Sequence, residues 1–217
     1  MLRTYCINLD RRTDRWQDLQ ANCQTHGLSP TALTRWSAVA EPEFGALGVA
    51  KSQTAALAHF LTQDASPYAL ILEDDFDFVR PFGELIERFN ALSQQRLDWD
   101  VLMLKGTAVI AMAPLPLGVA RVVEAQSAAA YLLSRRYAAT LLGCFAESIP
   151  HMEQWRSLPS RAHLVHRHAI DQVWKPLQRR DRWYIFNPAF GHQRPSFSDI
   201  EGRDVNYDAM TYGLATA

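Results

Sequence analysis

The chain has 217 residues, a net charge of −1 at pH 7 and a hydrophobic content of 48%. These values suit one globular domain with a substantial core, and they exclude a general attraction to nucleic acid or to acidic membranes. No apolar run approaches the roughly 20 residues that span a bilayer, and the start of the chain lacks a signal-peptide core, so we expect a cytoplasmic protein without a transmembrane segment.

Short apolar runs alternate with helical patterns along the chain. The runs predict strands at 2–9, 31–39, 69–72, 99–104, 119–124, 128–133 and 183–186. Helices are expected at 11–27 and 48–61, after Pro81, after a cap at Ser134, and around 170–177 with a kink or an end at Pro176. Segment 106–118 is expected to be an irregular loop or a hairpin, and the tail beyond Pro188 to be irregular. This alternation predicts an α/β fold with a mostly parallel sheet.

The most informative motif is the apolar run 69–72, which ends in the three carboxylates Glu73, Asp74 and Asp75. Three adjacent acids repel one another and cannot be buried unpaired. They are therefore expected at the carboxyl end of a strand, where open α/β sheets bind their ligands. Oxygen ligands of this kind suit Mg²⁺ or Mn²⁺. The alternative is a solvated acidic turn that leads into the helix at Pro81.

A second motif lies at the junction of the first strand and the first helix, where segment 8–15 carries three arginines. Arginines near a helix N-terminus can bind a phosphate or a nucleotide. In the alternative interpretation, Asp10 or Thr13 caps the helix, and the arginines are solvated or paired with Asp14.

A third motif is a glycine-led turn at Gly48, followed by Lys51 and Ser52. The spacing is not that of a phosphate-binding Walker A loop. A contact with a nucleotide or sugar and an ordinary helix cap are both open interpretations.

Two further candidates lie late in the chain. Asp171 begins a helical segment whose apolar face leaves its carboxylate free to point away from the core, so it can serve as a general base. Capping of the helix N-terminus is its alternative role. In the polar tail, His192 is a candidate for a metal site or for a diphosphate contact. The histidines show no H-E-x-x-H pattern, which argues against a zinc hydrolase.

Taken together, these motifs resemble glycosyltransferase family 25, the lipopolysaccharide-biosynthesis and collagen galactosyltransferase family. The matching segments are 7–15, 69–75, 98–102 and 130–136, followed in order by Asp171 and by Pro188, Gln193, Ser198, Asp199 and Ile200. The resemblance covers about residues 1–202, which implies a single glycosyltransferase domain at 1–202 and a C-terminal tail at 203–217.

The resemblance implies a GT-A-like nucleotide-sugar-binding fold with a mixed, mostly parallel sheet between helices. It also implies an inverting, Mn²⁺- or Mg²⁺-dependent transfer of galactose or a related hexose. The donor would be a UDP-sugar, and the acceptor a hydroxyl of a glycan or of a lipid-linked, lipopolysaccharide-type saccharide. A lipid-linked acceptor would bring the protein to the inner face of the membrane by peripheral contact.

By position in the family motifs, Asp75 is the expected metal ligand and Asp171 the expected base. Asp77, from a rival D-x-D register, and His192 are further candidate ligands. The residues expected to bind the nucleotide-sugar are Asn8, Asp10, Arg11, Arg15, Lys51, Ser52, Glu73, Asp74 and Gln193.

The chain departs from the family pattern in two places. The family's Ser-His pair is here Ser52-Gln53, and its glycine-rich approach to the later strand is here the segment 127–129. A catalytically silent relative that binds a nucleotide or a glycan is therefore a serious alternative. A receiver-like signalling domain is disfavoured, because its acidic pair would follow the first strand rather than residue 70.

Overall fold

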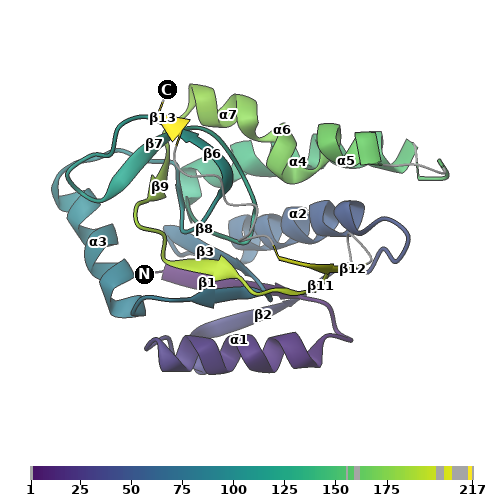
Figure 1. Ribbon diagram of the computed structural model, residues 1–217, viewed down its shortest axis with the longest axis horizontal. Helices are drawn as coiled ribbons and strands as arrows, with labels where there is room; N and C mark the ends of the chain where they lie inside the picture. Colours follow the sequence, from purple (N-terminus) through teal and green to yellow (C-terminus); the bar gives the residue numbers. More distant parts are fainter. Residues whose placement is uncertain (1, 155, 159–161, 199–202, 207–214, 217) are drawn as a thin grey trace.

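The computed structural model of the protein describes residues 2–154, 156–158, 162–198, 203–206 and 215–216, and its centre is a nine-stranded sheet (Figure 1). In spatial order, the strands are β13 (Ala215–Thr216), β6 (Thr107–Ala111), β7 (Val119–Gln126), β9 (Trp183–Phe186), β5 (Val101–Met103), β8 (Ala130–Ser134), β3 (Tyr68–Glu73), β1 (Leu2–Asn8) and β2 (Leu33–Ser37). Strands β1, β2, β3, β5 and β9 run in one direction, and β8 runs against them between β3 and β5. The carboxyl ends of the five parallel strands therefore share one edge.

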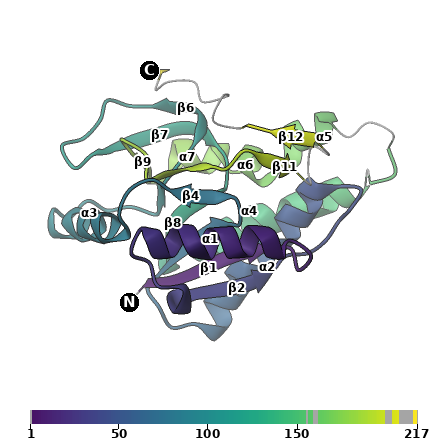
Figure 2. The same ribbon diagram turned by 60° about the horizontal axis from the view of Figure 1, so that its bottom comes forward.

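Helices cover both faces of this sheet. They are α1 (Thr13–Thr25), α2 (Gly45–Gln63), α3 (Phe82–Gln94), α4 (Arg135–Gln154), α5 (Ala162–His168), α6 (Ile170–Val173) and α7 (Lys175–Arg180), with a 3-10 turn at Pro30–Ala32. Helix α1 lies on one side of the sheet and α2 and α4 on the other (Figure 1), and α1 comes forward in the turned view (Figure 2). This arrangement of a mixed sheet between helices confirms the predicted α/β fold class.

The apolar runs are nearly continuous because both faces of the sheet are buried. Along β3, Leu70 and Leu72 belong to the same hydrophobic core as Leu19 of α1, whereas Ile71 belongs to the core on the opposite face, with Leu57 of α2. The side chains alternate between the two cores, as the period of a strand requires.

Several expectations about the elements hold. Segment 106–118 contains β6, which pairs antiparallel with β7, so it is a hairpin rather than an irregular loop. Helix α6 ends at Val173, and Pro176 lies in the first turn of α7, where its missing N–H costs no helical bond. Helix α2, in contrast, begins at Gly45, so Gly48 lies inside the helix and not in the predicted turn before it.

Two further expectations are wrong. Ser134 directly precedes α4, but its Oγ has no hydrogen-bond partner among the described residues, so its side chain does not cap the helix. The tail beyond Pro188 is not irregular throughout. Strand β10 (Gly191–Gln193) pairs antiparallel with β4 (Phe76–Phe78), and β11 (Ser196–Ser198) pairs with β12 (Arg203–Val205). Three-residue strands are too short to produce a readable alternation.

The predicted division at residue 202 falls among residues 199–202, which lie outside the described part of the chain. Beyond that point, β12 pairs with β11, and β13 adds a parallel strand to β6. Within the described residues, no helix is both long and apolar enough to cross a membrane.

Candidate functional site

A cavity of about 320 Å³ lies where the carboxyl ends of β1 and β3 meet the start of α2. One part of its wall is apolar and comes from the segment after β2 and the first turns of α2, through Ala38, Val39, Pro42, Gly45, Gly48 and Val49. The other part is polar and carries Arg11, Arg15, Glu73, Asp74, Asp75 and Gln193. The acidic run is thus at the edge of the sheet where it was expected, and it faces a cavity rather than open solvent.

Asp74 is fixed by protein groups on both of its oxygens. The Nδ2 of Asn8 donates to Oδ2 at 2.7 Å, and Nη1 of Arg15 donates to Oδ1 at 2.9 Å. Asn8 is itself oriented by Arg35, whose Nε donates to Oδ1 of Asn8 at 2.8 Å. Asn8 and Arg15 therefore hold the acidic run in place, and Arg15 also reaches the cavity wall.

Arg15 links the first helix to the late strand β11 as well. Its Nη2 donates to Oγ of Ser196 and to the carbonyl of Phe197, both at 2.7 Å. Phe197 contributes to the cavity wall, so this guanidinium ties one side of the cavity to the other.

Asp75 has a carboxylate oxygen without a hydrogen-bond partner in the described part of the chain. Its Oδ1 is buried and has no hydrogen-bond partner among the described residues, and its Oδ2 lies 3.6 Å from Nη1 of Arg15. Burial raises the pKa of Asp75, and the charge of Arg15 opposes that rise. A buried carboxylate oxygen without a partner is costly, and a bound cation would remove the cost.

Glu73 ends β3 with its carboxyl group in the same acidic environment. Burial raises the pKa of Glu73 to about 8, and the negative charges of Asp75, Asp74 and Asp171 add to the rise. The nearby amide of Gln53 acts in the opposite direction. The Glu73 carboxyl therefore holds its proton near neutral pH unless a positive charge arrives.

Asp171 lies in the first turn of α6, one residue beyond the start of the helix. It does not cap the helix, because the cap residue is Ala169 and Oδ2 of Asp171 accepts instead from the backbone N–H of Ser127 at 3.2 Å. Burial raises the pKa of Asp171. Its charge acts on Glu73, so the structure brings the predicted base to the acidic run.

Sequence reasoning did not assign Lys105 or Ser127 to the site, although both contact Gln193, a predicted binding residue that lines the cavity. Gln193 Oε1 lies 2.8 Å from Oγ of Ser127 and 3.4 Å from Nζ of Lys105, and both groups can donate to it. Lys105 is only 3% exposed and follows β5 at the carboxyl edge of the sheet. The available signal was a lone lysine directly after a predicted buried strand, since strand ends meet at this edge.

Three of the predicted binding residues have structural roles at or near the cavity. Lys51 pairs with Glu41 at 2.7 Å and with Glu153 at 2.9 Å. Ser52 lines the cavity, but its Oγ donates to the carbonyl of Gly48 at 2.6 Å and accepts from the N–H of Val39 at 2.8 Å. These bonds tie the segment after β2 to α2.

Asp10 is the third of these residues, and it is largely exposed. Its carboxylate accepts from Arg35 and from Ser37, both at 2.7 Å. These two bonds hold the pKa of Asp10 below its ordinary value. A contact between Asp10 and a ligand stays a prediction.

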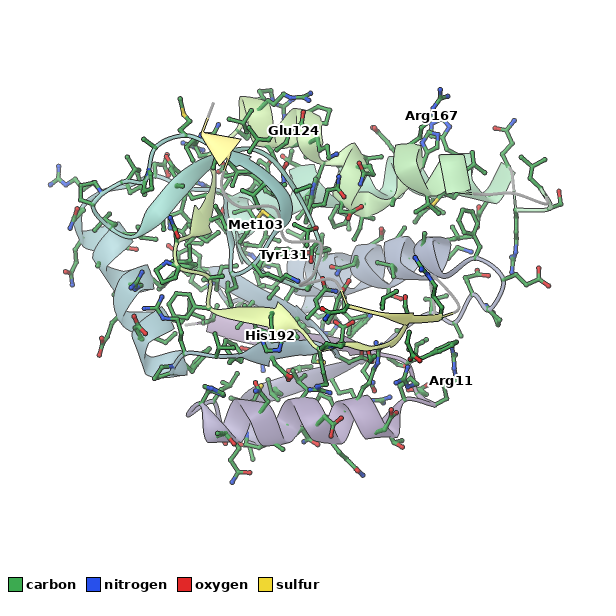
Figure 3. All side chains as sticks on the ribbon, viewed as in Figure 1. Arg11, Met103, Glu124, Tyr131, Arg167 and His192 are labelled. Carbon is green, nitrogen blue, oxygen red and sulfur yellow. The ribbon has the colours of Figure 1, made fainter. Side chains whose placement is uncertain are left out.

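Asp77 and His192 face each other across β4 and β10, and neither lines the cavity. Asp77 forms a two-pronged ion pair with Arg194, at 3.0 Å to Nε and 2.5 Å to Nη2. Figure 3 shows His192 well separated from Arg11, which does line the cavity. The roles of Asp77 and His192 as metal ligands stay predictions, and this arrangement does not favour them.

The acidic run offers few protein ligands to a metal. No cluster of three or more His, Cys, Asp or Glu side chains in the described part of the chain is arranged to hold an ion. Mg²⁺ usually takes only one or two carboxylates and completes its shell with water and substrate phosphates. The unpartnered Oδ1 of Asp75, with Glu73 beside it, fits that kind of site.

The comparisons with known proteins find similarity to solved structures but no match in sequence. A scan of protein-family models and a search of curated protein sequences find no match. The crystal structure of A197 from STIV aligns over 100% of this chain and 98% of its own, with a TM-score of 0.50 and 9% identity. This match shows a shared fold and nothing about activity.

Two other solved structures align less well. A glycosyltransferase involved in the glycosylation of the major capsid of PBCV-1 matches over 86% of this chain and 93% of its own, with a TM-score of 0.41 and 9% identity. Mannose-1-phosphate geranyltransferase from Thermus thermophilus matches over 85% of this chain and 58% of its own, with a TM-score of 0.41 and 10% identity. At this level of similarity, they carry no argument about function.

Proposed function

We propose that the protein is a GT-A-like glycosyltransferase that moves galactose or a related hexose from a UDP-sugar to a hydroxyl of a glycan or a lipopolysaccharide-type acceptor. The observation that carries this proposal is the two-part cavity at the carboxyl edge of the sheet. Its apolar wall suits a nucleoside, and its acidic end suits a divalent ion that faces a diphosphate. The family resemblance of the motifs supports the same assignment.

Asp75 and Glu73 are the residues that would hold Mn²⁺ or Mg²⁺. The unpartnered Oδ1 of Asp75 and the raised pKa of Glu73 both indicate that the nearby protein cations do not fully compensate the three carboxylates. When bound, such an ion supplies charge stabilisation to a leaving diphosphate. Asn8 and Arg15 keep the run aligned by fixing Asp74.

Asp171 is the residue that would take the proton from the acceptor hydroxyl in an inverting transfer. Its raised pKa brings it closer to neutral pH, which makes a carboxylate a better base. The backbone N–H of Ser127, in the segment between β7 and β8, donates to Oδ2 of Asp171 at 3.2 Å and so orients the carboxylate.

The test is to measure the release of UDP from a panel of UDP-sugars in the presence of Mn²⁺ and after addition of EDTA. We expect release with one sugar and its loss with EDTA. Metal-dependent binding of UDP without turnover of any donor would instead identify a silent nucleotide-binding relative. Absence of UDP binding under both conditions contradicts the proposal.

We also propose that the protein acts in the cytoplasm. A lipid-linked acceptor would draw it to the inner face of the membrane by peripheral contact. Sedimentation with vesicles that carry such an acceptor, compared with plain vesicles, tests this point. Equal sedimentation with both vesicle types contradicts recruitment by the acceptor.

A further inference from the structure

Lys105 is a buried charge that the proposed chemistry does not yet use. Its side chain follows β5 at the carboxyl edge of the sheet, and the residue is 3% exposed. Burial of an ammonium group is costly unless opposite charge lies close by. Asp75 is one opposite charge close enough to feel it: burial raises the pKa of Asp75, and the charge of Lys105 acts against that rise.

Lys105 does not reach the cavity wall itself. Its Nζ lies 3.4 Å from Oε1 of Gln193, which does line the cavity, and the amide of Gln193 lies beside Asp75. Lys105 therefore acts from behind the site, through Asp75 and Gln193. It is a positioning residue rather than one that touches a substrate.

A second protein cation, Arg15, also lies at the acidic run. Arg15 Nη1 lies 2.9 Å from Asp74 and 3.6 Å from Asp75. Two positive charges thus act on Asp75, and one of them also pairs with Asp74. They compete with a divalent ion for these oxygens, and the same charges attract a diphosphate.

We propose that Lys105 keeps the acidic run from holding a divalent ion tightly on its own, so that the ion enters together with the nucleotide diphosphate. This inference rests on the proposed function. The lysine repels a free ion, but it attracts the negative charge that the diphosphate brings with that ion. Its removal should therefore change the two affinities in opposite directions.

The experiment compares Lys105→Met with Lys105→Arg, which keeps the charge and is the matched control. Calorimetry measures the binding of Mn²⁺ alone and then of UDP in the presence of Mn²⁺. For Lys105→Met, we expect Mn²⁺ alone to bind about tenfold more tightly and UDP about tenfold more weakly, the effect of about 1.4 kcal/mol of electrostatic energy. Lys105→Arg should retain both wild-type affinities.

A purely structural role for Lys105 would weaken both affinities together, and this result overturns the inference. Unchanged affinity for Mn²⁺ alone in Lys105→Met overturns it as well. Lys105→Gln is the second variant if Lys105→Met does not unfold cooperatively on heating. If the wild-type protein binds no UDP in the presence of Mn²⁺, the proposed function fails before the role of Lys105 is reached.

Discussion

The hydroxyl of Tyr131 donates a hydrogen bond to Oε1 of Gln53 at 2.7 Å, and both side chains are fully buried. The bond joins β8 to α2 close to Glu73. Burial raises the pKa of Tyr131, and the charge of Glu73 adds to the rise. Nε2 of Gln53 has no hydrogen-bond partner among the described residues, although the amide is close enough to Glu73 to lower its pKa. Gln53 is therefore bonded into the buried packing beside Glu73.

Replacement of Gln53 by Leu should destabilise the protein. It leaves the hydroxyl of Tyr131 buried without an acceptor, at a cost of about 1–3 kcal/mol. Urea unfolding measures this difference. The double variant Gln53→Leu with Tyr131→Phe removes both partners, so it should lose less stability than the sum of the single variants. Additive losses would show that the hydrogen bond contributes little.

Replacement of Asp75 by Ala should abolish metal-dependent binding of UDP. The change removes the carboxylate oxygen that has no protein partner, and with it the best ligand for the ion. Calorimetry with UDP and Mn²⁺ measures the loss, which we expect to exceed about tenfold in affinity. Glu87→Ala, which removes an exposed carboxylate on α3, is the matched control and should bind normally. Normal binding by Asp75→Ala would contradict the metal assignment.

Much of the central sheet follows from the sequence because its strands are buried on both faces. The apolar run that ends at Glu73 could be predicted as a strand. Because parallel strands end at the same edge of a sheet, Asn8 after the first strand and Asp75 after this one were expected at one edge. The cavity beside them and the approach of Asp171 could not be derived, because they depend on how α2 and α6 pack against the sheet.

Other features depend on partners that are distant in the sequence. Lys51 and Asp77 lie beside candidate motifs in the sequence. In the structure, Lys51 forms ion pairs with Glu41 and Glu153, and Asp77 forms one with Arg194. Nothing in the local pattern reveals which acid and which base meet. For the same reason, the sequence shows no role for Lys105, whose neighbour Gln193 comes from the tail.

The metal-free protein should lose stability as the pH rises from about 5 to about 8. Burial raises the pKa of Glu73 to about 8, above its ordinary value, so the folded state holds a proton that the unfolded chain has already released. The stabilising contribution of this proton is complete below the pKa of Glu73 in the unfolded chain, and it disappears as the pH rises past the pKa of Glu73 in the folded state. For one proton, the slope is at most about 1.4 kcal/mol per pH unit.

Urea unfolding across this pH range measures the slope. Mn²⁺ should flatten the profile, because a bound cation favours the ionised carboxylate. Glu73→Gln, which cannot ionise, should flatten it without metal. A profile of Glu73→Gln that keeps the wild-type slope would assign the effect to other groups, among them Asp75 and Asp171, whose pKa values are also raised.

Replacement of Asp171 by Asn should leave donor affinity intact and remove sugar transfer. The amide oxygen can still accept the N–H of Ser127, so the start of α6 keeps its contact, but the side chain can no longer take a proton. We expect at least about a hundredfold loss in the transfer rate, the range of a general base, with unchanged calorimetric affinity for UDP in the presence of Mn²⁺. A variant Asp171→Asn that transfers sugar at the wild-type rate would exclude Asp171 as the base.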